Sequence, residues 1–320
     1  MKVASQTVPR VSVAVTSYSL RRLNDLKELL VILSKQTFKD FEIVILIEKS
    51  IELEVAINDF ISRTGLSNAR TVFIQGELGQ SRARNIAVAN CVAEIIAFID
   101  DDAIPAVDWV ENIAKIMADG SVIALTGATL PLWETSGADW FPKEFYWIVS
   151  CTEFTGWKST REVDRLWGVN MAFRREAMLY TSFKHGHVAS ESGKSGIEGD
   201  DVGFGIELAL RSSKRLLFEP KVRVYHRITS GRLSLNYIRR KGFWLGFTRR
   251  AFRRTYGDVS KRTLDNESII VAARFMAMSL FSLAKNPVRS WKRLSLASFV
   301  LLFVALGFAV EAGRPLYATG

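Results

Sequence analysis

The first 126 residues alternate between short apolar runs and stretches with helical periodicity. The apolar runs, each predicted to be a buried strand, cover residues 11–15, 41–47, 71–75, 94–99 and 121–126. The predicted helices between them cover residues 23–35, 81–91 and 105–117. Strands that alternate with helices of this length form mainly parallel sheets buried on both faces. We therefore predict an α/β fold in which a mainly parallel sheet lies between two layers of helices.

Beyond residue 127 the pattern loosens, and residues 130–166 combine four Trp with Pro and polar residues. This composition is typical of an irregular binding region, although Trp133 and Trp147 are equally well explained as core residues. Short strands are expected to resume near residues 170–173, 215–219 and 222–225. A chain of 320 residues, 48% of them hydrophobic, is long enough for one such domain and an appendage.

Positive charge is concentrated in one segment. The chain has a formal net charge of +10, and residues 221–262 hold 13 Lys and Arg against one acidic residue, Asp258. Aromatic residues such as Phe243 and Trp244 are interleaved with these cations, as in segments that lie on anionic lipid headgroups. A nucleic acid would satisfy the same charge. The segment contains no nucleic-acid-binding motif, so we expect no nucleic-acid partner.

The apolar segment 294–310 has roughly the minimum length of a membrane-spanning helix. Basic and Trp residues precede it, which predicts a helix over 294–311 whose N-terminal side faces the cytoplasm. A buried core helix is the alternative. A second apolar run, 269–283, carries Arg274 in its middle and is better explained as an interfacial or re-entrant helix.

The two cysteines, Cys91 and Cys151, lack metal-binding spacing, and a disulfide between them is not expected. The first nine residues contain no apolar run of the kind a secretory signal needs. Both observations favour a cytoplasmic location for the domain that precedes the C-terminal segments.

Three consecutive carboxylates, Asp100–Asp102, directly follow the apolar run that ends at residue 99. This places them at the carboxyl end of a parallel strand, where α/β sheets bind ligands. Adjacent carboxylates repel one another unless a cation or hydrogen bonds compensate. Mg²⁺ and Mn²⁺ prefer such oxygen ligands. The alternative is an acidic turn that caps the next helix.

Two further motifs hold ionisable side chains near predicted element ends. Asp200 and Asp201 precede a predicted helix over 202–210, where either a general base or a simple N-cap is plausible. His226 ends a short predicted strand and is one of only three histidines. A neutral imidazole is an acceptable Mn²⁺ ligand, but a lone histidine is more often structural.

In this order, the motifs resemble those of the family 2 glycosyltransferases, which have the GT-A fold. The resemblance runs from about residue 11 to His226 and continues more weakly to about residue 254. It rests on the 11–18 strand and loop, Gln36-Thr-Phe38, Gly79, Arg82-Ala-Arg84-Asn85, Asp100-Asp-Asp102, Trp167-Gly-Val-Asn-Met171, Asp200-Asp201 and Val-Tyr-His226. Their order and spacing together make the match specific.

The resemblance implies a nucleotide-diphosphate-sugar donor, with UDP favoured, and a divalent cation, Mn²⁺ or Mg²⁺. Thr16, Tyr18 and Glu48 would hold the base and ribose, while Arg82 and Arg84 would face the diphosphate. Gly79, Asn85 and Asp101 belong to the same donor-binding motifs. Asp102 and His226 would bind the cation, and Asp100 would contact the ribose or the cation. Asp201, or its neighbour Asp200, would be the base of an inverting displacement.

Two departures from the family pattern matter. Glu48 stands where the family often has the second Asp of Asp-Asp-Gly-Ser. Its carboxylate could bind either uracil or guanine, so the nucleotide base of the donor stays open between the two. Residues 239–244 lack the Gln-x-x-Arg-Trp motif of processive synthases, which indicates single additions.

The sequence therefore predicts a catalytic domain over 1–228, a basic and aromatic membrane-surface segment over 229–267, and membrane-associated helices over 268–320. The expected protein is a single-pass or peripheral membrane enzyme that acts on a lipid-linked or cell-surface glycan. An inactive, membrane-tethered nucleotide-sugar-binding scaffold is the alternative.

Overall fold

The computed structural model describes residues 8–314, except 77–78, 137, 185–198 and 258–265. These residues form two compact units. The first unit runs to Leu130 and also contains Lys158–Lys184 and Phe204–Arg227. The second contains Pro131–Trp157, residues 199–203 and the chain from Ile228 onward.

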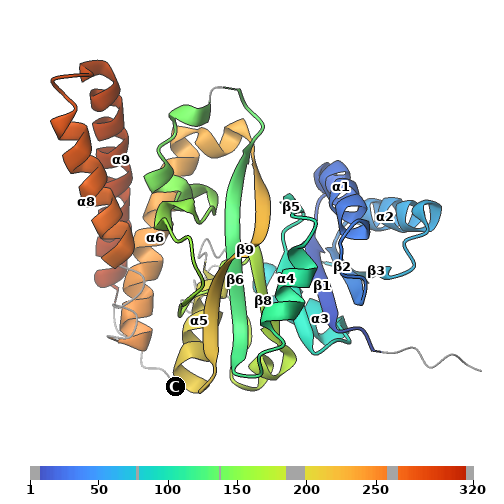
Figure 1. The fold of residues 1–320 in the computed structure, drawn as a ribbon. Helices are drawn as coiled ribbons and strands as arrows, with labels where there is room; N and C mark the ends of the chain where they lie inside the picture. Colours follow the sequence, from blue (N-terminus) through green and yellow to red (C-terminus); the bar gives the residue numbers. More distant parts are fainter. Residues whose placement is uncertain (1–7, 77–78, 137, 185–198, 258–265, 315–320) are drawn as a thin grey trace, which may run out of the picture. The chain divides into compact units, whose positions relative to one another are not determined.

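The first unit is built on one sheet with the strand order β3-β2-β1-β4-β8-β6-β9-β5, and β7 also pairs with β9 (Figure 1). The strands are β1 Val11–Ser17, β2 Phe41–Glu48, β3 Ala69–Ile74, β4 Ile95–Ile99, β5 Ala103–Pro105, β6 Val122–Trp133, β7 Arg161–Glu162, β8 Asn170–Arg174 and β9 Arg215–Ile228. Strands β3, β2, β1 and β4 are parallel, while β8 runs antiparallel to both β4 and β6. The α/β prediction is confirmed, but only one half of the sheet is parallel.

Helices cover both faces of this sheet. They are α1 Leu23–Ser34, α2 Ile51–Thr64, α3 Gln80–Asn90, α4 Trp109–Ile116 and α5 Asp200–Arg211, with the short 3-10 helices η1 Leu20–Arg22 and η5 Arg175–Leu179. Alternate residues of β1 point to opposite faces, so Val13 and Val15 join a core with α1 and α4, whereas Ala14 joins a core with α3 and α5. The two cores are why β1, β2 and β4 carry apolar residues on both faces rather than on alternate positions only.

Three expectations from the sequence are corrected. The helix predicted from Pro105 begins at Trp109, because Pro105 lies in β5 and pairs with Val224 of β9. The two strands predicted near 215–219 and 222–225 are one continuous strand, β9. Strand β6 continues to Trp133, so part of the stretch expected to be irregular belongs to the sheet.

The second unit is mainly helical. Its elements are the short helices η2 Ala138–Trp140, η3 Lys143–Val149, η4 Glu153–Thr155 and η6 Ser230–Leu233, and the long helices α6 Leu235–Tyr256, α8 Asn266–Phe281 and α9 Pro287–Ala312. Its core joins η3, α6, α8 and α9. Phe145 of η3 meets Phe275 of α8 edge to face at a centroid distance of 5.3 Å, and Ile238 of α6 and Val300 of α9 are fully buried.

Helices α6 and α9 cross at glycines. A Cβ atom on Gly246 would lie 1.9 Å from the carbonyl oxygen of Val304, and one on Gly307 would lie 1.9 Å from that of Phe243. Gly242, four residues before Gly246, faces Val300. The spacing of small residues brings the two backbones into direct contact.

Among the described residues, one helical stretch, Ser290–Ala312 in α9, is long and apolar enough to cross a membrane, with a mean hydropathy of 2.2. Only 22% of its most apolar window is buried inside the structure. Most residues of this window are therefore not fully buried by the part of the chain described here.

Candidate active site

The carboxyl ends of β1, β2 and β4 lie side by side at one edge of the parallel half of the sheet, and they end at Ser17, Glu48 and Ile99. Asp100–Asp102 follow β4 at this edge, as the sequence predicts. Because β1 and β2 are buried and paired with each other, the site is attached to the core of the unit.

Strand pairing brings His226 to the acidic turn. Ala103 of β5 is opposite His226 of β9, and the backbone nitrogen of Arg227 donates to the carbonyl oxygen of Asp102 at 3.0 Å. His226 Nε2 lies 3.2 Å from Asp102 Oδ1, and both side chains are almost completely buried. Two residues separated by more than 120 positions are thus fixed together by backbone hydrogen bonds.

Asp100, Asp102 and His226 form a group with metal-ligand geometry. One ligand atom from each of the three lies within 4.8 Å of the others. Two carboxylates and one imidazole are a donor set that suits Mn²⁺ and, through its oxygens, Mg²⁺. The predicted ligand residues therefore converge, and they fit a divalent cation.

Arg22, at the end of η1, also reaches the acidic turn. Its Nη2 lies 3.0 Å from Asp102 Oδ2, and its guanidinium also pairs with Asp25 and approaches Asp101. Burial lowers the pKa of Arg22, but the attraction of Asp102 and Asp101 raises it, and the net shift of the pKa is upward. The sequence analysis missed Arg22 because Leu20-Arg21-Arg22 has no spacing that distinguishes a site residue from a surface one.

Asp101 points to β1 rather than to His226. Ser17 Oγ donates to Asp101 Oδ2 at 2.5 Å. Burial raises the pKa of Asp101 to about 7, with a further upward contribution from Asp102, while the bond from Ser17 opposes the shift. Asp101 is thus distinct from its two neighbours, and its hydrogen bond fixes the turn to the end of β1.

Glu48 is buried at the end of β2 and accepts a hydrogen bond from the backbone nitrogen of Gly79 at 3.3 Å. Gly79 is the N-cap residue of α3, and its φ of +76° is a backbone conformation that favours glycine. Lys49 Nζ lies 5.4 Å from the ring centroid of Tyr18, which is 57% exposed. These residues and Thr16, the sixth residue of β1, lie at the edge predicted to bind the donor.

The two arginines of α3 have different surroundings. Arg82 is exposed, whereas Arg84 is buried and its guanidinium lies 5.6 Å from the ring centroid of Phe183. A Cβ atom on Gly168 would lie 2.2 Å from Arg84 Nη2, so Gly168 leaves the space that the guanidinium fills. Arg82 and Arg84 therefore differ in exposure, and only Arg82 is open to solvent.

The side-chain amides of Asn85 and Asn170 form hydrogen bonds with backbone groups of neighbouring segments. Asn85 exchanges two hydrogen bonds with Phe183, at 2.6 and 3.0 Å. Asn170 accepts from Trp109 Nε1 at 2.9 Å and donates to the carbonyl oxygens of Ala128 and Val222. Both motif asparagines thus hold neighbouring segments of the first unit together.

Asp200 and Asp201 belong to the second unit and open α5. Asp200 is 8% exposed, and Asp201 Oδ1 accepts a hydrogen bond from the backbone nitrogen of Val202 at 2.9 Å. Gly199, with φ of +111°, makes the turn that precedes them. Glu198, which the sequence groups with this pair, lies outside the described residues.

The chain is similar to known proteins both in sequence and in structure. The sequence model of Glycosyl transferase family 2 matches residues 12–179. A curated relative from Haloferax volcanii, "Glucosyl-dolichyl phosphate glucuronosyltransferase", is 24% identical over 310 residues, covering 95% of this chain and 96% of the relative.

Among solved structures, a mannosyltransferase from Pyrobaculum calidifontis in complex with GDP-Man and Mn²⁺ superposes with a TM-score of 0.62 at 16% identity, over 97% of this chain and 89% of that one. GalNAc-T7 with UDP, GalNAc and Mn²⁺ gives a TM-score of 0.51 at 16% identity, over 80% of this chain and 54% of that one. At this identity the two structures are similar to this chain in fold.

Proposed function

Because the chain belongs to glycosyl transferase family 2 and has the GT-A fold, we propose that it is an inverting, metal-dependent glycosyltransferase. It would move a sugar from a nucleotide-diphosphate donor to a hydroxyl of a lipid-linked glycan. The observation that carries this proposal is the convergence of Asp100, Asp102 and His226 at the carboxyl edge of the sheet. That edge is where α/β folds bind nucleotides.

Asp100, Asp102 and His226 would hold Mn²⁺ or Mg²⁺. When bound, the cation would neutralise charge on the departing nucleoside diphosphate. Both neighbouring solved structures contain Mn²⁺, which supports the choice of metal. Arg22 pairs with Asp102 and so offsets part of the negative charge of this group without the cation.

The donor would bind with its base and ribose against Thr16, Tyr18 and Glu48, with UDP favoured. Gly79 and Asn85 would shape the start of α3, and the exposed Arg82 is better placed than Arg84 to meet a diphosphate. Helix N-termini and arginines are common anion partners. Asp101 would keep the turn closed through Ser17.

The transfer itself would be a single in-line displacement. Asp201 would accept the proton of the acceptor hydroxyl, with Asp200 as its neighbour, and the hydroxyl oxygen would attack the anomeric carbon. The bond between that carbon and the diphosphate oxygen would break as the new bond forms, which inverts the configuration. The position of the pair in the first turn of α5, where the family motif predicts its acidic residues, supports this assignment.

The acceptor would be a glycan on a lipid phosphate. The curated relative, which matches nearly the full length of both chains, is named for a glucosyl-dolichyl phosphate acceptor. The apolar α9 and the basic α6 of the second unit support membrane association with the first unit in the cytoplasm.

Of the single-pass and peripheral topologies expected from the sequence, the packing of α6 favours the peripheral one. Gly242 of α6 faces Val300, near the middle of the apolar stretch of α9, and Lys241 is one residue away. At its other end, Arg254 Nη1 lies 3.2 Å from Glu311 Oε1. The two helices thus run in the same direction, side by side. A spanning α9 would carry the charges at 239–241 into the bilayer centre, at about 2.5–3.5 kcal/mol each.

Product analysis tests the proposed reaction. The purified full chain should release nucleoside diphosphate from one of UDP-, GDP- or CDP-sugars, with Mn²⁺, and the NMR spectrum of the product should show the inverted anomer. Asp201→Asn should slow transfer at least about hundredfold, as removal of a general base does. A product with the retained configuration, or full activity of Asp201→Asn, would overturn the mechanism.

A further inference from the structure

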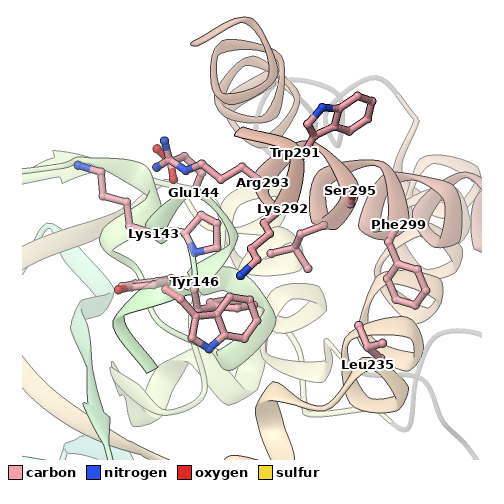
Figure 2. A pocket seen from close by; sticks show the side chains of 13 residues that line it. Lys143, Glu144, Tyr146, Leu235, Trp291, Lys292, Arg293, Ser295 and Phe299 are labelled. Carbon is pink, nitrogen blue, oxygen red and sulfur yellow. The ribbon is translucent and has the colours of Figure 1, made fainter. Parts of the chain in front are cut away.

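The second unit contains a large cavity, and none of its lining residues has a role in the reaction described above. Its volume is about 1030 Å³, and it is lined by residues 140–144, by Tyr146, by Leu235 at the start of α6 and by the first half of α9. Figure 2 shows Lys292 and Phe299 extending from α9, with Tyr146 on one side of the space and Leu235 on another. A space of this size accommodates a ligand larger than a sugar.

Apolar side chains form most of its wall, and several remain exposed. Phe141, Leu296 and Phe299 line the cavity, and Phe141 is 1% exposed. Trp140 and Leu235, which line it as well, are 55% and 64% exposed. Large exposed apolar surfaces that border a cavity mark a binding site for an apolar ligand. The wall therefore suits a hydrocarbon chain.

Cations lie beside this apolar wall. Lys143, Lys292 and Arg293 line the cavity, against one acidic residue, Glu144. Arg293 also lies over the ring of Phe275, with its Cζ 5.0 Å from the centroid, so packing holds its position. An apolar wall with an excess of positive charge is complementary to an amphiphile with an anionic head. A neutral lipid would leave these cations without a partner from the ligand.

Glu144 offers the ligand a hydrogen-bond acceptor in the cavity wall. Its Oε2 is buried and has no hydrogen-bond partner among the described residues. In Figure 2, Glu144 and Arg293 lie on the same side of the cavity. A buried carboxylate oxygen without a donor costs stability, and a ligand hydroxyl would satisfy it. A sugar next to a phosphate supplies such a hydroxyl.

The cavity begins where the uncovered side of α9 begins. Trp291, Ser295, Leu302 and Leu306 are exposed and recur at helical spacing, so they form one stripe along α9. Trp291 and the two cations that follow it have the composition of a membrane-interface anchor. A lipid in the leaflet that covers this stripe reaches the cavity without leaving the membrane.

We propose that this cavity binds the lipid-phosphate part of the acceptor, a polyprenyl phosphate that carries a sugar. The prenyl chain lies against Phe141, Leu296 and Phe299, and the phosphate is bound by Lys292 and Arg293. Glu144 accepts a hydroxyl of the attached sugar. The inference rests on the proposed function for the identity of the lipid, but the binding itself is measured without turnover.

Native mass spectrometry of the detergent-solubilised full chain tests this directly, with a short-chain polyprenyl phosphate as the probe. One lipid should bind per chain, and the matching prenol without phosphate should bind about tenfold more weakly. Inorganic phosphate should not displace the probe. If phosphatidylglycerol binds as well as the polyprenyl phosphate, the cavity is a site for bulk anionic lipid and the proposal is overturned.

Matched variants locate the site. Ser295→Trp fills the cavity and should reduce occupancy at least about tenfold, whereas Ser298→Trp, on the same helix but not part of the lining, should bind normally. Lys292→Gln should weaken binding of the phosphate form only, with Lys285→Gln as its control, and it serves as the second test if Ser295→Trp does not fold. Unchanged binding in Lys292→Gln and in folded Ser295→Trp overturns the proposal.

The two proposals fail separately. Nucleotide binding that needs Mn²⁺, together with no preference for the polyprenyl phosphate, rejects the cavity and leaves the transferase assignment intact. Specific capture of the polyprenyl phosphate without any nucleotide binding supports the cavity and rejects the proposed reaction.

Discussion

At the scale of single residues, the acidic turn is held by three different partners. Asp102 shares its oxygens between His226 and Arg22, and Asp101 takes a hydrogen bond from Ser17. The acidic triplet itself was predictable, because three carboxylates at a strand end carry a large repulsion. Arg22 was not, because its approach depends on the turn between β1 and α1 rather than on any local pattern.

Arg22 gives a prediction about stability. Without its guanidinium, the carboxylates repel one another, so Arg22→Gln should lose about 1–3 kcal/mol of unfolding free energy in EDTA. Mn²⁺ would compensate the same carboxylates, so it should raise the melting temperature more in Arg22→Gln than in the wild type. Arg21→Gln, on the neighbouring exposed arginine, is the control. Equal Mn²⁺ shifts in all three proteins would contradict the account.

The cysteines give a second prediction at this scale. Both are buried, and burial is the main cause that raises the pKa of Cys91 to about 12 and the pKa of Cys151 still further. Because the thiolate is the reactive species, iodoacetamide at pH 8 should leave both unmodified in the folded protein. Both should react in guanidinium chloride, as peptide mass spectrometry would show. Rapid alkylation of folded protein would be inconsistent with the packing around them.

At the scale of elements, the helices and strands that could be predicted are those whose sequence pattern is local. Strands β1, β2 and β4 were predicted because each is a short, mainly apolar run buried on both faces. Helix α2 was missed because only Leu53 and Ile57 are buried in it, although Ser50 and Gly65 cap its ends. The start of α4 was wrong because the pairing of Pro105 with β9 is a long-range contact that no local pattern reveals.

The glycine crossing of α6 and α9 was also missed. The sequence analysis treated Gly242-Phe-Trp-Leu-Gly246 as part of a basic surface segment, since cations dominate that stretch. The spacing was the available signal, and it pairs α6 with α9 through Gly246 and Gly307.

This crossing predicts the effect of one methyl group. Gly246→Ala or Gly307→Ala should force the backbones apart and lower the unfolding free energy by about 1–3 kcal/mol. Gly313→Ala, where a Cβ would meet its nearest atom at 3.7 Å, should be neutral. Thermal unfolding of the three variants measures this. A crossing that tolerates both alanines would mean that the helices do not pack at this distance.

At the scale of the whole molecule, one chain combines a GT-A fold with helices that carry charge beside an apolar stretch. Because α6 runs alongside α9, the charges of α6 set the depth at which α9 can lie. The proposed peripheral topology places both ends of α9 on the same side of the bilayer.

Labelling in sealed membrane vesicles distinguishes the topologies. Two single variants, Lys285→Cys before α9 and Gly313→Cys after it, should both react with a membrane-impermeant maleimide added on the catalytic unit's side of the membrane. The native cysteines are buried and should not contribute to the labelling. A spanning α9 predicts that only one of them reacts until detergent is added. Reaction on opposite sides would therefore refute the peripheral arrangement.

The central claim is that Asp100, Asp102 and His226 hold a divalent cation for a nucleotide-sugar donor. Isothermal titration calorimetry with UDP, GDP and CDP, each in Mn²⁺ or EDTA, tests it most directly. The account predicts that one nucleotide binds, that Mn²⁺ is required, and that Asp102→Asn weakens binding at least about tenfold. Asp119→Asn, which removes a surface carboxylate paired with Arg215, should bind normally. Equal binding in EDTA, or by Asp102→Asn, would contradict the claim.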